Sequence, residues 1–190
     1  MGSRFEDRQN QGLRFESELF QAVQGMGFNI AINGTEHTHP EFVSQLHRST
    51  DQTSLAVRFQ PDGVASVGKI PRTFYIEAKN SKMIEKTAHQ QYCKLATLGN
   101  IVVVVFKPFS NGWCFADSMP LIHGNETVRP FPIDRRFPVD EDGWLCPRQV
   151  GRRPSRGSGT PYREIDPARL ELWADFKSKV CSVLAGILGT

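Results

Sequence analysis

The chain has 190 residues, of which 39% are hydrophobic and 23% charged, which excludes low-complexity, collagen-like and mainly disordered proteins. No apolar run reaches the roughly 18 residues that a membrane-spanning helix needs, and the polar N-terminus is unlike a secretory signal. The formal net charge of +3 is too small to identify a nucleic-acid-binding protein by itself. Four scattered cysteines without a C-x-x-C pair argue against a zinc or disulfide framework, so we expect a cytoplasmic protein.

A first helix is predicted over residues 11–28. At 100° per residue its apolar side chains fall within about 40° of Leu19 and form one stripe. The stripe consists of Phe15, Leu19, Val23 and Met26. Gly25 and Gly27 end the helix, and residues 28–32 are predicted to form a short strand.

A polar stretch, residues 33–52, follows the first strand. Within it, residues 40–47 favour a short helix, because Pro40 suits a first helical turn. Residues 54–59 alternate in the manner of a strand, and Pro61-Asp62-Gly63 is typical of a turn or bulge.

A β-hairpin is predicted next, with strands at residues 64–67 and 73–79 and a turn at residues 68–71. Its second strand alternates cleanly between two faces. One face carries Phe74, Ile76 and Ala78, and the other carries Tyr75, Glu77 and Lys79.

A second helix is predicted over residues 82–98, with Ile84, Ala88 and Leu95 on its inner stripe. Residues 101–107 form a continuous apolar run, which is typical of a strand buried on both faces. Residues 113–116 favour another strand. Residues 117–165 are rich in Pro, Gly and Arg, so we expect loops there.

A final helix is predicted to begin where Asp166 caps it and Pro167 opens it, and to run on through Leu172 and Trp173 to Leu184. The order of the earlier elements reads α-β-β-β-α-β. A hairpin followed by a helical crossover predicts an α/β fold with a mixed central sheet and helices on its faces.

We expect a single domain over residues 1–190. Its core lies at about residues 11–116, followed by an irregular Pro/Gly/Arg-rich segment at 117–165 and a C-terminal helix at 166–188.

Three side chains of the predicted hairpin combine two carboxylates with a cation. Glu77 and Lys79 are two residues apart on a strand and share one face, and Asp62 lies upstream, where it comes opposite Glu77. Two acids brought together repel each other unless a cation lies between them, and their hard oxygens suit Mg²⁺ or Mn²⁺. The alternative is a surface strand with ordinary cross-strand ion pairs.

Two further polar residues lie near the inner stripes of the helices. Glu16 is about 60° from the centre of the first apolar stripe, so it points toward the body of the protein, where a carboxylate needs a partner. A metal site would supply that partner, and a salt bridge at the helix edge is the alternative. Gln91 lies within about 20° of the second stripe, which places it near the candidate site or in the core as a satisfied amide.

The pairing of Pro61-Asp62 with Glu77-Ala78-Lys79 resembles the PD-(D/E)XK signature of the restriction-endonuclease-like nucleases. The common core of that family has the order α-β-β-β-α-β. The resemblance implies the restriction-endonuclease-like fold, and it covers about residues 11–107.

The first helix is similar to that of archaeal-type Holliday junction resolvases. The similarity rests on the spacing of Gly12, Glu16 and the pair Gly27-Phe28. In those enzymes the helix carries a Glu of the metal site and ends in Gly-Phe before the first strand. Related nucleases also carry a polar residue on the second helix that reaches the site, which is the place of Gln91 here.

The resemblance implies a role for each matched residue. Asp62 and Glu77 would ligate the metal together with the Ala78 backbone carbonyl, and Glu16 would bind a second metal or a metal-bound water. Lys79 would orient and activate the attacking water and offset the charge of the phosphate.

The implied activity is that of a Mg²⁺-dependent DNA endonuclease, with Mn²⁺ able to substitute. The spacing in the first helix favours a structure-selective, resolvase-like enzyme, which we expect to act as a homodimer because two strands must be cut. One alternative is a sequence-preferring restriction-type or phage-type endonuclease, and another is a non-catalytic nucleic-acid-binding module of the same fold. No phosphate-loop motif is present, so we expect no ATP, and we expect no membrane partner.

One basic segment supplies the excess positive charge. Residues 148–163 contain five arginines and no acid, whereas the rest of the chain has 18 basic and 20 acidic residues. The five are Arg148, Arg152, Arg153, Arg156 and Arg163. As a flexible basic loop the segment would bind DNA phosphates, and the alternative is a solvated linker.

Replacing Arg152, Arg153 and Arg156 with alanine is expected to weaken DNA binding and to flatten its salt dependence. Each lost phosphate contact should lower the slope of log K against log salt by about one unit. Fluorescence anisotropy over a salt series measures that slope, and an unchanged slope would identify the segment as a linker.

Overall fold

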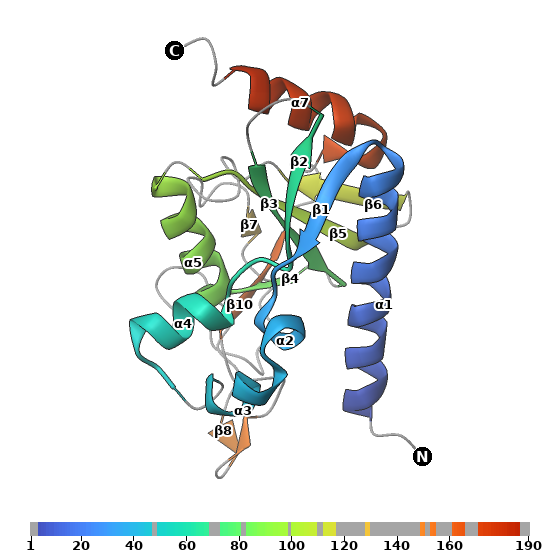
Figure 1. Cartoon of the computed structure of the whole chain (residues 1–190). Coiled ribbons are helices and arrows are strands. Elements are labelled where there is room, and N and C mark those ends of the chain that lie inside the picture. Colours follow the sequence, from blue (N-terminus) through green and yellow to red (C-terminus); the bar gives the residue numbers. More distant parts are fainter. Residues whose placement is uncertain are drawn as a thin grey trace.

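The computed structural model describes residues 4–46, 49–68, 73–80, 83–98, 100–109, 112–116, 128–129, 149–150, 153–154, 161–165 and 171–186. Its centre is a six-stranded mixed sheet (Figure 1). The strand order is β1 (Phe28–Ile32), β2 (Gly63–Val67), β3 (Thr73–Lys79), β5 (Val102–Phe109), β6 (Gly112–Ala116) and β11 (Glu171–Leu172). The pairing of β3 with β5 is parallel, and the other pairings are antiparallel.

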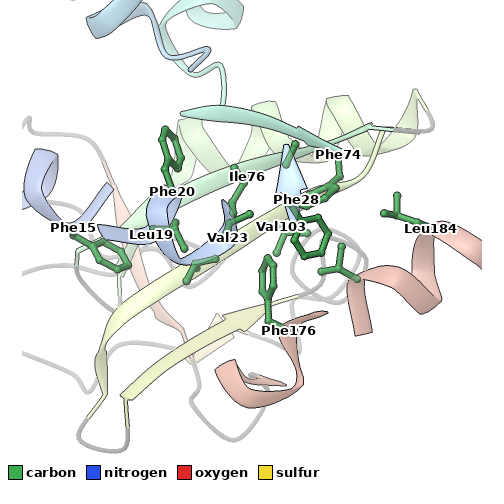
Figure 2. Close-up of a cluster of buried hydrophobic side chains, with 13 residues drawn as sticks. Phe15, Leu19, Phe20, Val23, Phe28, Phe74, Ile76, Val103, Phe176 and Leu184 are labelled. Atoms are coloured by element: carbon green, nitrogen blue, oxygen red, sulfur yellow. The ribbon is translucent and has the colours of Figure 1, made fainter. Parts of the chain in front are cut away.

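Helices cover both faces of this sheet. The face that carries α1 (Arg4–Gly25) and α7 (Phe176–Gly186) has a core of aromatic and aliphatic side chains, which Figure 2 shows. The opposite face packs against α5 (Lys86–Thr97). The mixed α/β architecture predicted from the sequence is therefore confirmed.

Strand β5 contributes to both cores. Val103 and Val105 belong to the core beneath α1, whereas Val102, Val104 and Phe106 belong to the core beneath α5. This alternation explains the continuous apolar run, because both faces of the strand are buried. Strand β3 divides in the predicted way, with Phe74 and Ile76 beneath α1 and Tyr75 against the α5 core.

The chain between β1 and β2 forms an insertion of short helices, defined here as residues 33–60. It contains α2 (Thr35–Thr38), η1 (Pro40–Phe42), α3 (Val43–Leu46) and α4 (Gln52–Arg58), which lie beyond the ends of β1 and β2 (Figure 1). The short helix predicted at residues 40–47 corresponds to η1 and α3.

The prediction of a strand over residues 54–59 is wrong, because α4 occupies this stretch. The backbone N–H of Ser54 donates to Asp51 Oδ1 at 3.0 Å, which caps the helix. The alternation of Leu55 and Val57 with their neighbours is too short to distinguish a strand from a helix, and the cap at Asp51 favours the helix.

The helix predicted over residues 82–98 begins later than expected, at Lys86. Residues Met83–Glu85 form strand β4 instead, which pairs antiparallel with β10 (Tyr162–Ile165). Pairing with a strand distant in sequence overrides the helical pattern here. The backbone N–H of Lys86 donates to the Pro161 carbonyl at 2.7 Å where the helix starts.

The stretch predicted as loops, residues 117–165, contains four short strands among its described residues. Strand β7 (Val128–Arg129) pairs with β10 in a sheet of order β4-β10-β7, and β8 (Gln149–Val150) pairs with β9 (Arg153–Pro154). These strands are too short to leave a periodic signal in the sequence.

The C-terminal helix also begins later than predicted. Leu172 lies in β11 and Trp173 begins η4 (Trp173–Asp175), so α7 starts only at Phe176. Pairing of β11 with β6 extends the sheet by one strand, which explains the difference. The predicted cap at Asp166 and Pro167 lies outside the described residues. No helix in the described part of the chain is long and apolar enough to cross a membrane.

Gly63, the first residue of β2, has no room for a side chain. A Cβ atom there would lie 3.0 Å from Phe20 Cζ and 3.1 Å from Ile76 Cγ2. Gly63→Ala is therefore expected to lower the free energy of unfolding by about 1–3 kcal/mol, measured by urea denaturation.

Gly12→Ala is the matched control, because nothing lies within 4 Å of a Cβ atom at that helical position. This variant should be neutral or more stable by up to about 1 kcal/mol. Adding Phe20→Leu to Gly63→Ala should restore part of the loss. Equal stability of the two glycine variants would contradict the steric explanation.

Candidate active site

The structure brings together Asp62, Glu77 and Lys79 at the start of the β2–β3 hairpin. Asp62 directly precedes β2, and the register that pairs Gly63 with Ile76 carries Asp62 to Glu77. The backbone N–H of Asp62 donates to Glu77 Oε2 at 3.2 Å, and the backbone N–H of Ala78 donates to Asp62 Oδ2 at 2.7 Å. Each carboxylate is thus oriented by a backbone group of the neighbouring strand.

Lys79 pairs with one of the two carboxylates. Its ammonium donates to Glu77 Oε1, and the two side chains share the face of β3 that looks toward α5. The Lys79 side chain is 25% exposed, whereas the Glu77 side chain is only 5% exposed. Burial by itself lowers the pKa of the ammonium, but the charges of Glu77 and Asp62 outweigh it and raise the pKa above its ordinary value. Lys79 is therefore protonated at neutral pH.

At Asp62 the effects that disfavour the charged form outweigh those that favour it. Burial, and then the charge of Glu77, raise the pKa of its carboxyl well above the ordinary value, although the charge of Lys79 acts against them. The charge of Glu16 raises it further, and the bond from the Ala78 N–H lowers it. One lysine does not compensate two converging carboxylates, so the pair can accommodate a further cation.

Tyr92 of α5 also contacts Glu77. Its ring is buried, and its hydroxyl hydrogen-bonds with Glu77. Burial, and then the charges of Glu77 and Asp62, raise the pKa of this hydroxyl well above its ordinary value, so Tyr92 remains a donor. Lys79 Nζ lies 5.9 Å from the centroid of its ring.

Sequence reasoning selected Gln91 on this helix and missed Tyr92. Gln91 is buried, but Tyr92 is the α5 residue that lines the cavity containing Asp62 and Glu77, among the described residues. Tyr92 follows Ala88 by four residues, on the buried side of the helix. That spacing is typical of a core residue, and nothing in the pattern indicates that its hydroxyl reaches a carboxylate on β3.

Glu16 lies close to the site but apart from its cavity. It is half-buried on α1 and lines a separate pocket of about 370 Å³ together with Phe20, Ile30 and Ile32. Phe20, one turn further along, packs over Gly63, which places this side of α1 near Asp62. In the described part of the chain, no three His, Cys, Asp or Glu side chains come together as a metal-binding group. Asp62 and Glu77 therefore form a pair, and the charge of Glu16 acts on Asp62.

A cavity of about 250 Å³ opens over the acidic pair. The hairpin contributes Asp62, Glu77 and Lys79 to its lining, and β4 and α5 contribute Glu85 and Tyr92. The insertion contributes the remaining described residues, which are Gly34, Thr35, Arg58, Phe59 and Gln60. The sequence alone did not connect the insertion with the acidic pair.

Three residues of the insertion clamp the chain that leads into Asp62. Asn33 N–H and Gly34 N–H donate to the Asp62 carbonyl at 2.8 Å and 3.1 Å. The Asn33 side chain donates to the Pro61 carbonyl at 3.1 Å. The buried Thr35 hydroxyl donates to the Val57 carbonyl at 2.6 Å. This clamp, defined as residues 33–35, fixes the end of α4 and the start of β2 together.

The basic segment is described only in part. Arg148, Arg152 and Arg156 lie outside the described residues, whereas Arg153 belongs to β9 and Arg163 to β10. In β10 the neighbouring Tyr162 pairs with Glu85, which lines the cavity. The C-terminal end of the basic segment is therefore joined, through β4, to the wall of the candidate site.

Comparison with known proteins gives a distant likeness to a solved structure. No protein-family model and no curated protein sequence matches the chain. Among solved structures, the chain is similar to Hjc, a Holliday junction resolvase from the archaeal hyperthermophile Archaeoglobus fulgidus, at 14% sequence identity and a TM-score of 0.43. The match covers 87% of this chain and 98% of that chain. The geometry of the site, and not this likeness, supports the function proposed below.

Asp62→Asn is expected to make the metal-free protein more stable at neutral pH. Because the pKa of Asp62 is raised above its ordinary 3.8 in the folded state, the free energy of unfolding falls as pH rises from about 4 toward the folded pKa. Asparagine has no titratable carboxyl, so this loss of stability does not occur. Its side-chain oxygen still accepts the hydrogen bond from the Ala78 N–H. Thermal unfolding in a chelator should show the difference near pH 7 and its disappearance near pH 3.

Asp175→Asn serves as the control, because Asp175 is exposed and far along the chain in η4. This substitution removes a carboxylate outside the site and should not reproduce the gain in stability at pH 7. A lower stability of Asp62→Asn at pH 7 would show that the carboxylate is needed to hold the hairpin together and would contradict the repulsion inferred here.

Proposed function

We propose that the chain is a metal-dependent DNA endonuclease of the PD-(D/E)XK type, which hydrolyses phosphodiester bonds. The observation that carries the proposal is the convergence of Asp62 and Glu77 in an open cavity, with Lys79 two residues further on the same strand face. This is the arrangement that the sequence signature implies, and it is built on an antiparallel hairpin next to a parallel strand.

Burial of the acidic pair argues against an ordinary ion pair on a strand surface. Exposed ion pairs contribute little to the free energy of folding, and their groups keep pKa values close to the ordinary ones. Here Glu77 is nearly inaccessible, and the pKa of Asp62 is raised by burial and by Glu77. A buried carboxyl with a raised pKa beside a second carboxylate in a cavity is typical of catalytic and metal-binding sites.

The donor set fits a divalent cation with a preference for oxygen. Asp62 and Glu77 would hold it, joined by the Ala78 carbonyl, and Mg²⁺ or Mn²⁺ suits such hard ligands. When bound, the ion would neutralise phosphate charge and lower the pKa of a water ligand. Glu16 would act on this centre through its charge or through a second ion.

Lys79 and Tyr92 have roles that follow from their protonation. A lysine whose pKa is raised stays charged, so Lys79 would donate to the phosphate or to the attacking water and would not act as a base. Tyr92, also protonated, would hold Glu77 in its ligating orientation. Gln91, buried beside it, would support the packing of α5.

The substrate proposal is structure-selective cleavage by a resolvase-like homodimer. It rests on the first-helix spacing of Gly12, Glu16 and Gly27-Phe28, and on the need for two active sites to cut two strands. Sequence-preferring cleavage is the second candidate, because the insertion lines the cavity and would supply further DNA contacts.

The testing experiment is a cleavage assay in Mg²⁺ or Mn²⁺ with a four-way junction, a flap, linear duplex, single-stranded DNA and RNA as substrates. Wild type should cleave, and Asp62→Asn and Glu77→Gln should each lose about 10²-fold or more in kcat. Both variants should still bind DNA, because removing a carboxylate reduces its repulsion with phosphate.

Glu18→Gln is the matched control for charge removal. Glu18 pairs with the exposed Arg14 on the first helix, so this variant should cleave like wild type. Binding without cleavage by wild type in either metal would favour the non-catalytic module. A discrete band pattern on long duplex DNA, with no preference for the junction, would favour the sequence-preferring enzyme.

A further inference from the structure

A cation from the insertion lies in the same cavity as the acidic pair. Arg58, the last residue of α4, lines the cavity together with Asp62, Glu77 and Lys79. It comes from a different part of the chain than the hairpin, and neither the signature nor the basic segment includes it. Among the described residues, no carboxylate lies within ion-pair distance of Arg58.

The position of Arg58 is fixed by local structure. Its guanidinium carbon lies 4.8 Å from the centroid of the Phe59 ring, and Phe59 packs against the core beneath α5. The clamp then holds the backbone on both sides of this pair, at the Val57 carbonyl and at the carbonyls of Pro61 and Asp62. Arg58 and Asp62 thus belong to one short segment that the clamp holds at both ends.

The charges of the cavity explain what Arg58 can bind. Three carboxylates line it, those of Asp62, Glu77 and Glu85, and the Lys79 ammonium is already bonded to Glu77. A polyanionic strand entering this space needs a further cation outside the acidic pair. The planar guanidinium suits a phosphate group, which it can contact with two parallel N–H donors.

We propose that Arg58 binds a backbone phosphate that flanks the scissile one, and that the insertion is thereby a substrate-binding wall of the site. The inference rests on the proposed nuclease function. Arg58 lines the cavity of the acidic pair and forms no ion pair with Asp62 or Glu77. It can therefore bind a neighbouring phosphate without displacing Lys79.

The first test measures DNA binding without metal. Fluorescence anisotropy of a labelled four-way junction in EDTA, over a salt series, compares wild type with Arg58→Ala and Arg58→Lys. Arg58→Ala should weaken binding about 3–10-fold and reduce the salt slope by about one unit, as expected for one lost phosphate contact. Arg58→Lys should restore the slope and only part of the affinity, because lysine keeps the charge and loses the bidentate geometry.

Arg14→Ala is the matched control, because Arg14 is an exposed arginine paired with Glu18 on α1 and does not line the cavity. This variant should keep the affinity and the salt slope of wild type. Urea denaturation of all variants checks folding, and Arg58→Lys provides a second comparison in case Arg58→Ala loses the packing of its side chain on Phe59.

The second test separates a flanking phosphate from the scissile one. With Mg²⁺ present, Arg58→Ala should raise KM for the preferred DNA about 3–10-fold and leave kcat within about 3-fold of wild type. A loss confined to kcat, with unchanged KM, would overturn the flanking assignment.

The outcomes also separate this inference from the proposed function. Unchanged affinity and salt slope in Arg58→Ala, with cleavage by wild type intact, would overturn the role of Arg58 and leave the nuclease standing. A reduced slope with no cleavage by wild type would support the phosphate contact and count against the nuclease. Failure of wild type to bind any DNA would overturn both.

Discussion

The repulsion between two carboxylates in a partly desolvated position is the constraint on which the site depends. Asp62 and Glu77 are brought together by the antiparallel register of β2 and β3, and crossed backbone hydrogen bonds keep their oxygens in place. Such a pair lowers the stability of the fold unless cations and donors surround it. The neighbouring groups reduce this cost at Glu77, because the Lys79 ammonium and the Tyr92 hydroxyl both donate to its carboxylate. In the described part of the chain, the hydrogen bond that Asp62 Oδ2 accepts comes from the backbone N–H of Ala78, which leaves its side of the pair open to a further cation.

The insertion is part of this arrangement as much as the hairpin. Residues 33–35 donate three hydrogen bonds to the chain between α4 and β2, and the buried Thr35 hydroxyl donates a fourth to Val57 in the last turn of α4. Buried donors and acceptors must be paired, so the clamp is maintained by the cost of breaking it. The carbonyl of Asp62 is thereby held on one side, while its carboxylate is held on the other by the Ala78 N–H.

The sequence predicts those parts of the fold and site whose pattern is local. Alternation along β3 separates Phe74 and Ile76 from Glu77, and the apolar run of β5 predicts a strand with two buried faces. The helix α4 and the strand β4 were predicted wrongly, because a single cap at Asp51 and a partner strand far along the chain decide them. Tyr92 and Arg58 were not identified for a related reason. Their side chains reach the acids through tertiary packing, which no periodicity records.

The two walls of the cavity therefore have separate structural origins. The acidic wall is set by strand register, whereas the wall that carries Arg58 is set by the cap of α4 and by the clamp. Contacts to phosphates position a nucleic acid without reading its bases. In the proposed nuclease, the wall carrying Arg58 would thus select the path of the DNA backbone across the acids and not the identity of the bases. If both proposals hold, such a site would discriminate bent or branched DNA from straight duplex, because only some backbone paths would bring two successive phosphates to the two walls together.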